Sequence, residues 1–291
     1  MVSSERGDLK KGFAEADIIV EREFRSEPVH QGYIEPQALI ATASEDGAVE
    51  IWTTTQGHFV IRGLCARLLN MDMSSIRVTA SEIGGGFGGK NNVYAEPVAI
   101  RLSQKTGRPV RMVMTRSEVF RGTGPASGTY SRVRMGAMRD GTIVAAEAEI
   151  YNQAGAFKGS PVGRSTDSFF SSYSIANAKA TAYDVCVNRP KVAAYRAPGA
   201  PMATMAAELT INELAEKLDI DPVDLRMKNA VQDGGQSLNG AKYGRIGLTE
   251  VLETVKSHPH YSAPLAPNQG RGFALGYWMH GGGLRRVVAN L

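Results

Sequence analysis

Seven residues between a predicted strand and a predicted helix form a glycine cluster that could bind a ligand. The segment reads GGGFGGK from Gly84 to Lys90, and five of its residues are glycines. Glycine has no Cβ, so backbone N–H groups in such a loop can approach an anionic or polar group closely. We therefore expect this loop to hold a cofactor.

Two nucleotide-binding motifs fit the same residues, and each lacks one part. The G-x-G-x-x-G pattern that starts at Gly84 calls for an acidic residue about 20 positions further on to bind a ribose, and residues 104–111 contain none. The G-x-x-x-x-G-K pattern calls for Ser or Thr after the lysine to hold magnesium, and this chain has Asn91 there. A nucleotide-triphosphate-binding module that uses the loop stays an alternative, as does a non-catalytic fragment of the fold.

Alternating strands and helices surround the glycine loop and would position it. Hydrophobic periodicity predicts strands over 17–25, 38–43, 49–54, 76–80 and 109–114, and helices over 59–69 and 94–105. The breaker-rich segment 122–128 (GTGPASG) predicts a hinge between two lobes. Beyond it we expect a hairpin of strands 131–138 and 142–152 that turns at Asp140-Gly141, and a helix over 201–218 with Met205, Leu209, Leu214 and Leu218 on its apolar face. A last helix begins at Pro222 and ends near Gly234-Gly235. The fold class is α+β, a mixed α/β chain with two lobes.

Composition excludes several classes of protein. The 291 residues carry a formal net charge of +4, but the basic residues are scattered, which argues against a nucleic-acid groove. No apolar stretch approaches the ~18 residues of a membrane span. Residues 1–15 are polar and of mixed charge, so we expect a linker or the remnant of a missing upstream domain. The expected protein is cytoplasmic, with no nucleic acid and no membrane as partner.

Three motifs in one order resemble a known family. Thr55-Gln56 stand at the head of a helix, the glycine loop follows, and residues 194–199 read AYRAPG. Together with the helical segments after Pro201, they resemble the molybdenum-cofactor subunit of the xanthine dehydrogenase, aldehyde oxidase and carbon monoxide dehydrogenase family, the molybdenum hydroxylases. The resemblance implies a molybdopterin-binding domain of the xanthine dehydrogenase type. It assigns residues 16–257 to the first cofactor-binding domain, with lobes divided near 122–128, and residues 258–291 to a truncated start of the second.

The resemblance also implies which residues contact the cofactor. Gln56 matches a glutamine that faces an oxo ligand of molybdenum, and Gly86, Phe87 and Gly88 match the loop that closes on the metal end. Arg196 matches an arginine beside the metal and its pyranopterin. The dithiolene of the cofactor would hold molybdenum, so no direct protein ligand to the metal is expected. The protein would supply hydrogen bonds around it instead.

Four further residues match the substrate pocket of the family, namely Asn91, Ala197, Pro198 and Arg164. Purine-oxidising members carry a glutamate at the position of Asn91, and carbon monoxide dehydrogenases carry a copper-binding cysteine at the position of Ala197. An amide cannot replace the carboxylate, and alanine cannot bind copper. We therefore expect neither purine nor carbon monoxide as the small-molecule substrate.

The implied enzyme is a multi-subunit oxidoreductase of which this chain is one part. It would hydroxylate a C–H bond of an aldehyde or N-heterocycle with water as the oxygen source. Its cofactor would be molybdenum-molybdopterin in a dinucleotide form, and electrons would leave through iron–sulfur clusters and FAD in partner subunits, because two cysteines are too few to hold clusters here. The general-base glutamate of the family lies in a G-x-G-E motif that this chain lacks. We therefore expect no catalytic residue in this chain, little activity from it alone, and a need for the remaining molybdopterin-domain polypeptide. We expect the chain to be a fragment, a truncated frame or one piece of a split subunit.

Overall fold

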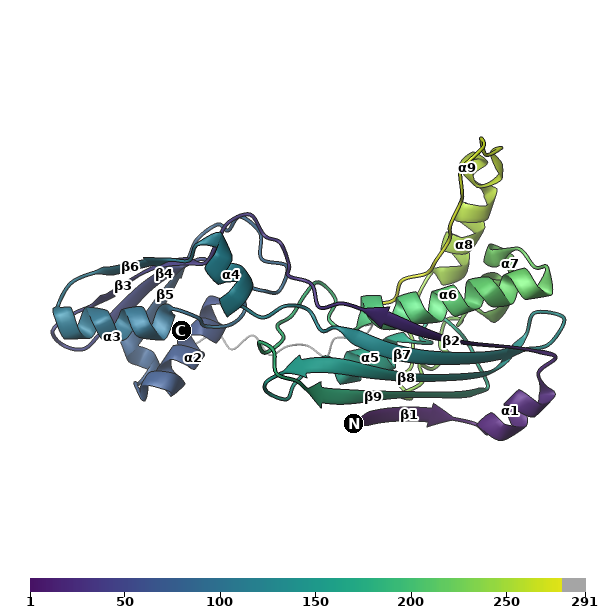
Figure 1. The fold of residues 1–291 in the computed structure, drawn as a ribbon, viewed down its shortest axis with the longest axis horizontal. Coiled ribbons are helices and arrows are strands. Elements are labelled where there is room, and N and C mark those ends of the chain that lie inside the picture. Colours follow the sequence, from purple (N-terminus) through teal and green to yellow (C-terminus); the bar gives the residue numbers. More distant parts are fainter. Residues whose placement is uncertain (279–291) are drawn as a thin grey trace.

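Two β-sheets form two lobes in the computed structural model, which describes residues 1–278 (Figure 1). The large lobe holds a five-stranded sheet of order β1-β9-β8-β7-β2, with bounds Val2–Arg6, Asn177–Cys186, Ile143–Gly155, Thr129–Ala137 and Ile18–Ser26. The small lobe holds a four-stranded sheet of order β5-β4-β3-β6, with bounds Ile76–Ala80, Val49–Thr53, Ala38–Ala43 and Val110–Val113. Each sheet packs on its own hydrophobic core. This arrangement confirms the expected α+β class with two lobes.

The helices divide between the two lobes. Those of the small lobe are α2 (His58–Leu69), α3 (Glu96–Thr106) and α4 (Arg116–Gly122), with a 3₁₀ turn at Met73–Ser75. Those of the large lobe are α1 (Leu9–Glu15), α5 (Val162–Ser168), α6 (Ala200–Leu218), α7 (Pro222–Asn229), α8 (Leu248–Ser257) and α9 (Pro259–Ser262). Helices α2, α3, α5 and α6 pack against the sheet of their own lobe. Within residues 1–278, no helix combines the length and the apolar character that crossing a membrane requires.

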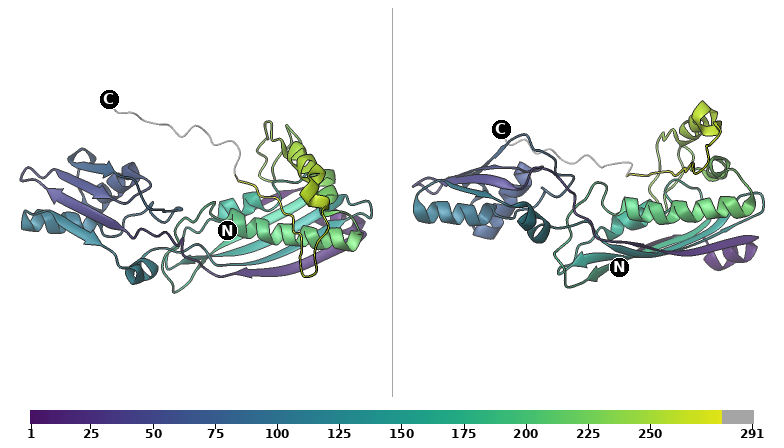
Figure 2. Two further views of the ribbon diagram at one scale, coloured as in Figure 1. Left: turned by 90° about the horizontal axis from the view of Figure 1, so that it is seen from above. Right: turned by 45° about the horizontal axis from the view of Figure 1, so that its top comes forward.

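Within residues 1–278 the chain passes between the lobes twice, and the two passages lie side by side. Strand β2 pairs with β7 in the large lobe, so residues 27–37 carry the chain to the small lobe and residues 123–128 bring it back. The sequence predicted only the second passage. Figure 2 shows from two further sides that extended segments join the lobes. The small lobe is therefore inserted between two neighbouring strands of the large sheet.

Residues 1–15 form a strand and a helix, so the expected linker is wrong as a description of their structure. Strand β1 pairs antiparallel with β9, from Val2 opposite Ala182 to Arg6 opposite Ala178. Helix α1 begins after Asp8, whose side chain accepts a hydrogen bond from the Lys11 N–H at 3.1 Å. An edge strand with mostly exposed side chains lacks the apolar alternation that marks a strand in a sequence.

Alanines, and not the predicted large apolar residues, form most of the buried face of α6. The helix buries Ala203, Ala206, Ala207, Ile211 and Leu214, among others, whereas Met205 and Leu209 are exposed. Small residues at this spacing allow the helix axis to approach β2 and β7 closely. Of the four residues that we predicted for the apolar face, Leu214 is buried and Leu218 packs at its edge.

The end of α7 also differs from the prediction. The helix ends at Asn229, whose side chain donates to the carbonyls of Gly141 and Leu225 and accepts from the Ile143 N–H. The next residue, Ala230, forms a β-bridge with Tyr173. These contacts draw the chain into extended backbone before the glycines at 234–235. The hairpin at Asp140-Gly141 is present as predicted, with Gly141 at φ +88°.

Histidine 30 links the two passages between the lobes and should make stability depend on pH. Its Nδ1 accepts from the Gly32 N–H at 3.0 Å, so in the neutral ring Nε2 donates to Thr123 Oγ1 at 2.8 Å. Burial lowers the pKa of His30 below its ordinary value of 6.5, and the Arg116 guanidinium lowers it further.

Because the folded chain binds this proton less readily than the unfolded chain, stability should be full above pH 6.5 and decrease as the pH falls through it. Urea unfolding at a series of pH values checks this. The His30→Asn variant keeps an acceptor but does not titrate, so its stability should change less between neutral pH and pH 5.5. Equal pH dependence in both proteins would contradict the assignment.

Candidate functional site

The glycine loop and the segment 194–199 meet at the passages between the lobes. The Arg196 N–H donates to the Phe87 carbonyl at 2.9 Å. Gly88 has φ +102°, and a Cβ there would lie 2.6 Å from the Ala194 carbonyl oxygen. The Gln31 side chain, from the first passage, donates to the carbonyls of Ala194 at 2.8 Å and Gly124 at 3.1 Å. Two motifs more than a hundred residues apart are thus held as one unit.

Gln56 fixes the glycine loop from the small lobe. It stands between β4 and α2, and its backbone N–H donates to the Lys90 carbonyl at 3.0 Å. Its side-chain Oε1 accepts from the N–H groups of Gly88 at 2.8 Å and Lys90 at 3.2 Å. Gly86 must be a glycine to admit this side chain, because a Cβ there would lie 2.6 Å from Oε1. The Nε2 donor of Gln56 has no partner among residues 1–278, so it is the end available to a ligand.

Lys90 serves the fold and does not face a ligand. The residue is 1% exposed, and its Nζ lies 2.7 Å from Glu35 Oε2 and 5.0 Å from the centre of the Tyr33 ring. The same Glu35 oxygen accepts from the Gly84 N–H at 2.8 Å. A lysine that is buried and paired in this way cannot reach phosphate groups. This geometry argues against the nucleotide-triphosphate alternative.

The donors left free around the loop fit the oxygen-rich end of a cofactor. The N–H groups of Gly85, Gly86 and Phe87, and the guanidinium of Arg196, have no hydrogen-bond partner in the described part of the chain. Two non-glycine residues, Phe87 at φ +50° and Ala197 at φ +59°, hold the left-handed backbone that turns these segments. A cluster of donors fits oxo and phosphate oxygens, which only accept. The donor set therefore fits a molybdopterin cofactor, which carries both.

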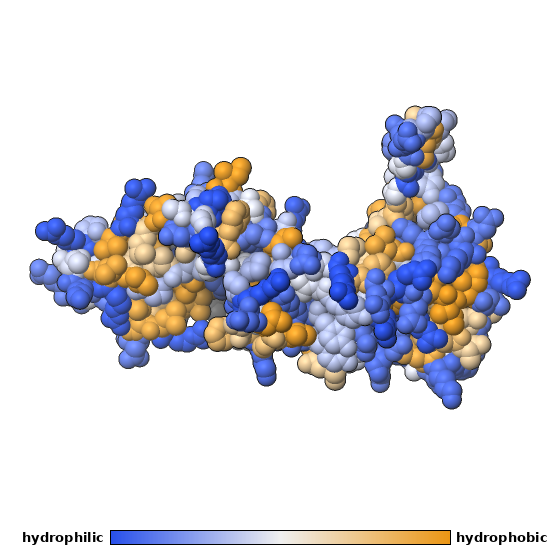
Figure 3. Space-filling view, in the orientation of Figure 1, coloured by the Kyte–Doolittle hydropathy of each residue, from blue (hydrophilic) through white to orange (hydrophobic). Residues whose placement is uncertain are grey.

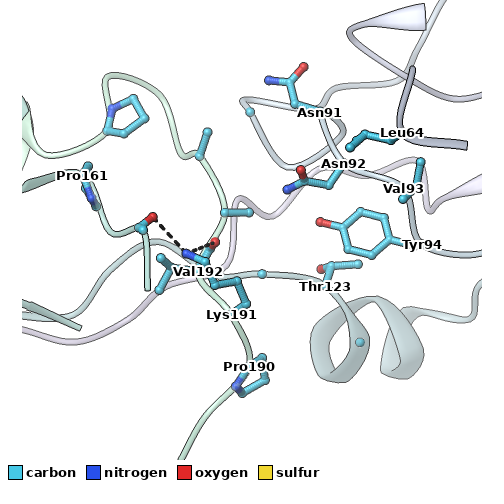
Figure 4. Close-up of a pocket in the computed structure, with 17 residues that line it drawn as sticks. Leu64, Asn91, Asn92, Val93, Tyr94, Thr123, Pro161, Pro190, Lys191 and Val192 are labelled. Atoms are coloured by element: carbon cyan, nitrogen blue, oxygen red, sulfur yellow. Dashed lines mark hydrogen bonds between the residues drawn. The ribbon is translucent and has the colours of Figure 1, made fainter. Parts of the chain in front are cut away.

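A cavity of about 670 Å³ adjoins this unit (Figure 4). Gly88, Asn91 and Pro198 line it, together with residues of α2, of the second passage and of segment 190–194. Figure 4 shows Asn91, Asn92 and Tyr94 on one wall, and Pro161 and Pro190 to Val192 on the other. The cavity thus lies between the lobes, beside the glycine loop.

The predicted substrate residues divide between two cavities. Asn91 and Pro198 line the first, whereas Ala197 lines a second cavity of about 320 Å³ along α6. Arg164 lines neither; its guanidinium lies 5.3 Å from the ring centre of Trp278, which lines the second. Among the described residues, no group of three or more His, Cys, Asp or Glu could hold a metal ion.

Several residues that shape the site were not predicted from the sequence. Gln31 and Glu35 lie in the first passage, for which no regular element was predicted, and Lys191 follows a proline in an irregular segment. Glu35 meets Lys90 across 55 positions of sequence. The sequence held one signal for Glu35. Lys90 stands inside a glycine cluster, and a lysine that becomes buried there needs an acidic partner.

Comparison with known proteins identifies the family. Residues 1–230 match the molybdopterin cofactor-binding domain family. The chain is 30% identical over 256 residues to the nicotinate dehydrogenase large molybdopterin subunit of Eubacterium barkeri, covering 87% of this chain and 60% of that one. It is 32% identical over 269 residues to xanthine dehydrogenase/oxidase of Mus musculus, covering 90% of this chain and 20% of that one.

A solved structure agrees. Aldehyde oxidoreductase from Desulfovibrio gigas superimposes with a TM-score of 0.81 at 27% identity, over 87% of this chain and 28% of that one. The chain thus spans less than two thirds of the length of each of these proteins. The match over residues 1–230, at the loop and the segment described above, shows that the chain belongs to the molybdopterin cofactor-binding domain family of the molybdenum hydroxylases.

Proposed function

We propose that this chain is the molybdopterin-binding part of an enzyme that hydroxylates a C–H bond of an aldehyde or N-heterocycle, with water as the oxygen source. One observation carries the proposal. The glycine loop and segment 194–199 are joined at the Arg196–Phe87 hydrogen bond, and free donors surround this joint beside a cavity. The relatives named as nicotinate and xanthine dehydrogenases and as aldehyde oxidoreductase support this reaction class.

Five residues would hold the cofactor, namely Gln56, Gly86, Phe87, Gly88 and Arg196. The Gln56 Nε2 group and the loop N–H groups would donate to oxygens at the metal end. The Arg196 guanidinium would bind the pterin side. When bound, molybdenum-molybdopterin, which we propose in a dinucleotide form, supplies the two-electron redox chemistry that protein side chains lack. The chain's own part is to bind, orient and exclude water.

Asn91 and Pro198 would line the substrate pocket in the first cavity. The Asn91 amide can both donate and accept, so it can orient a carbonyl oxygen or a ring nitrogen. Ala197 would act through the second cavity beside α6, and Arg164 through its contact with Trp278, which lines that cavity. The apolar walls of the first cavity, such as Leu64, Val93 and Pro161, suit an aromatic ring.

The other parts of the enzyme would be partner polypeptides. We propose an iron–sulfur subunit, an FAD subunit and the remaining molybdopterin-domain polypeptide, which would bring the general base. Figure 3 shows hydrophobic residues gathered over the lower part of the small lobe, where Figure 1 places α2. Phe59, Val60 and Leu68 of this helix are exposed. An apolar surface of this kind supports docking of another polypeptide.

Oxygen transfer from water is the test of the proposed function. The chain is coexpressed with the open reading frames beside its own. The assembled protein is given quinoline, which has no oxygen of its own to exchange with water, and an electron-accepting dye in water labelled with oxygen-18. The proposal predicts dye reduction and one heavy oxygen in the product. Dye reduction with unlabelled product would contradict the proposed reaction. Cofactor-loaded protein inert toward every aldehyde and heterocycle tried would favour the non-catalytic fragment.

The residue at position 91 should exclude xanthine. A site that relies on a buried hydrogen bond rejects a substrate by about 10⁴-fold or more when one partner is missing. We expect the assembled enzyme to oxidise xanthine negligibly, and Asn91→Glu to increase xanthine turnover relative to benzaldehyde turnover. Asn92→Glu, one position away on the same wall, is the matched control. Efficient xanthine oxidation by the unmodified enzyme would overturn the assignment of Asn91.

A further inference from the structure

Among the residues that the structure describes, Lys191 is the only charged side chain that lines the first cavity. The other lining residues are apolar, glycine or neutral and polar, and the latter include Asn91, Asn92, Thr123 and Tyr94. Figure 4 shows Lys191 on the wall opposite Asn91 and Asn92. The lining that residues 1–278 provide therefore combines apolar walls with one positive charge and no negative one.

The Lys191 ammonium is anchored in place without being neutralised. Its Nζ donates to the Gly159 carbonyl at 2.9 Å and to the Val192 carbonyl at 3.4 Å. No carboxylate among the described residues lies within 4.0 Å of it. An ammonium has three N–H donors, so one is left without a partner among residues 1–278 and is available to a ligand.

Asp184, whose charge acts on Lys191, is already hydrogen-bonded to the loop at 159–160. Its two carboxylate oxygens accept from the Gly159 N–H at 2.8 Å and the Ser160 N–H at 2.9 Å, and also from the Ser160 hydroxyl. Burial lowers the pKa of Lys191, and the Asp184 charge opposes this effect only in part. Asp184 thus fixes the loop whose Gly159 carbonyl accepts from Lys191. The partly buried Lys191 ammonium would be stabilised by an anion beside it.

We propose that Lys191 selects substrates that carry a carboxylate on an aromatic or heteroaromatic ring, with the ring between the apolar walls and the carboxylate on the Lys191 ammonium. This inference rests on the proposed function, since it names the substrate class of that cavity. A charge-assisted hydrogen bond at one end fixes which ring position faces the glycine loop.

Binding of benzoate to the 291-residue chain tests the proposal without the cofactor. Titrations followed by ligand-observed NMR compare benzoate with benzamide, which has the same ring and shape but no charge. Lys191→Gln should weaken benzoate binding by about 10- to 100-fold relative to benzamide, and Lys191→Arg should retain most of the preference. Lys158→Gln removes the same charge from an exposed neighbour outside the cavity and should change neither affinity.

Several results would overturn the proposal. These are no benzoate binding by the wild-type chain, equal binding of benzoate and benzamide, or benzoate binding that survives Lys191→Gln. Inorganic phosphate is a further probe. If phosphate binds more tightly than benzoate through Lys191, the cation serves a phosphate group and the proposal for a substrate carboxylate is wrong.

A comparison in the assembled enzyme separates this inference from the proposed function. The KM for 4-carboxybenzaldehyde should be lower than that for benzaldehyde, and Lys191→Gln should remove the difference. If benzaldehyde is oxidised but the preference is absent or does not depend on Lys191, the inference fails and the proposed function stands. If benzoate binds through Lys191 but the assembled enzyme oxidises no substrate, the proposed function fails and the anion site stands.

Discussion

Replacing Gly88 by alanine is expected to destabilise the chain by about 2–4 kcal/mol, because strain and steric overlap add at this position. The backbone at Gly88 has φ +102°, which side-chain-bearing residues rarely adopt, and the new Cβ would lie 2.6 Å from the Ala194 carbonyl oxygen. Both the glycine loop and segment 194–199 would have to shift. The midpoint of urea unfolding measures the loss.

Gly107→Ala is the matched control for Gly88→Ala. Gly107 also has a positive φ, +65°, but nothing lies within 4 Å of a Cβ built there. It should show the strain alone, roughly 1 kcal/mol. Equal losses in the two variants would contradict the packing role of Gly88. In the assembled enzyme, Gly88→Ala should also lower the molybdenum content, since the donors around the cofactor would move with the loop.

Arg226→Met is expected to cost about 3–5 kcal/mol, because it leaves a buried carboxylate without its counter-ion. The Arg226 side chain has no exposed surface, and its Nε and Nη2 lie 2.9 and 2.8 Å from Glu208 Oε2. Glu208 also accepts from the Tyr173 hydroxyl and from the Leu275 N–H at 2.7 Å. Burial, with the Glu208 charge as a second cause, raises the pKa of Tyr173 well above its ordinary value, so the phenol stays a donor.

The pair fixes the helix that carries segment 194–199 at its start. Glu208 lies on α6 and Arg226 on α7, so the loss of one partner should disturb both helices. Arg245→Met breaks an exposed ion pair with Glu250 at 3.3 Å and should cost less than about 1 kcal/mol. A loss of that small size in Arg226→Met would refute the structural role of the buried pair.

Local pattern predicted the elements that carry large apolar residues on one side. The helix at 58–69 and the strands of the small sheet are present close to the predicted bounds, because their periodicity reflects burial on one face. Strand β1 was missed because its side chains are mostly exposed. Strand β9 was missed because small buried alanines, such as Ala178 and Ala180, give little hydrophobic contrast.

The order of the motifs predicted which segments come together, but not how they are held. Gln56, the glycine loop and segment 194–199 come together at the passages between the lobes. Gln31, Glu35 and Lys191 could not be predicted, because each acts through a contact made across at least 32 positions of sequence. The sequence also suggested that the glycines make room for the cofactor. In the structure, Gly86 and Gly88 make room for Gln56 and Ala194.

The molybdenum and pterin contents of the assembled protein test the central claim most directly. The chain is produced with the polypeptides encoded beside it in a host that makes the cofactor. Mass spectrometry measures molybdenum and fluorescence measures pterin, and both amounts are divided by the amount of this chain. The account predicts close to one molybdenum and one pterin per chain in the wild type. It predicts a large loss of both in the double variant Gln56→Ala, Arg196→Ala, whose side chains supply two of the proposed contacts. Wild-type protein that assembles with its partners but contains neither, or a double variant that keeps both in full, would contradict it.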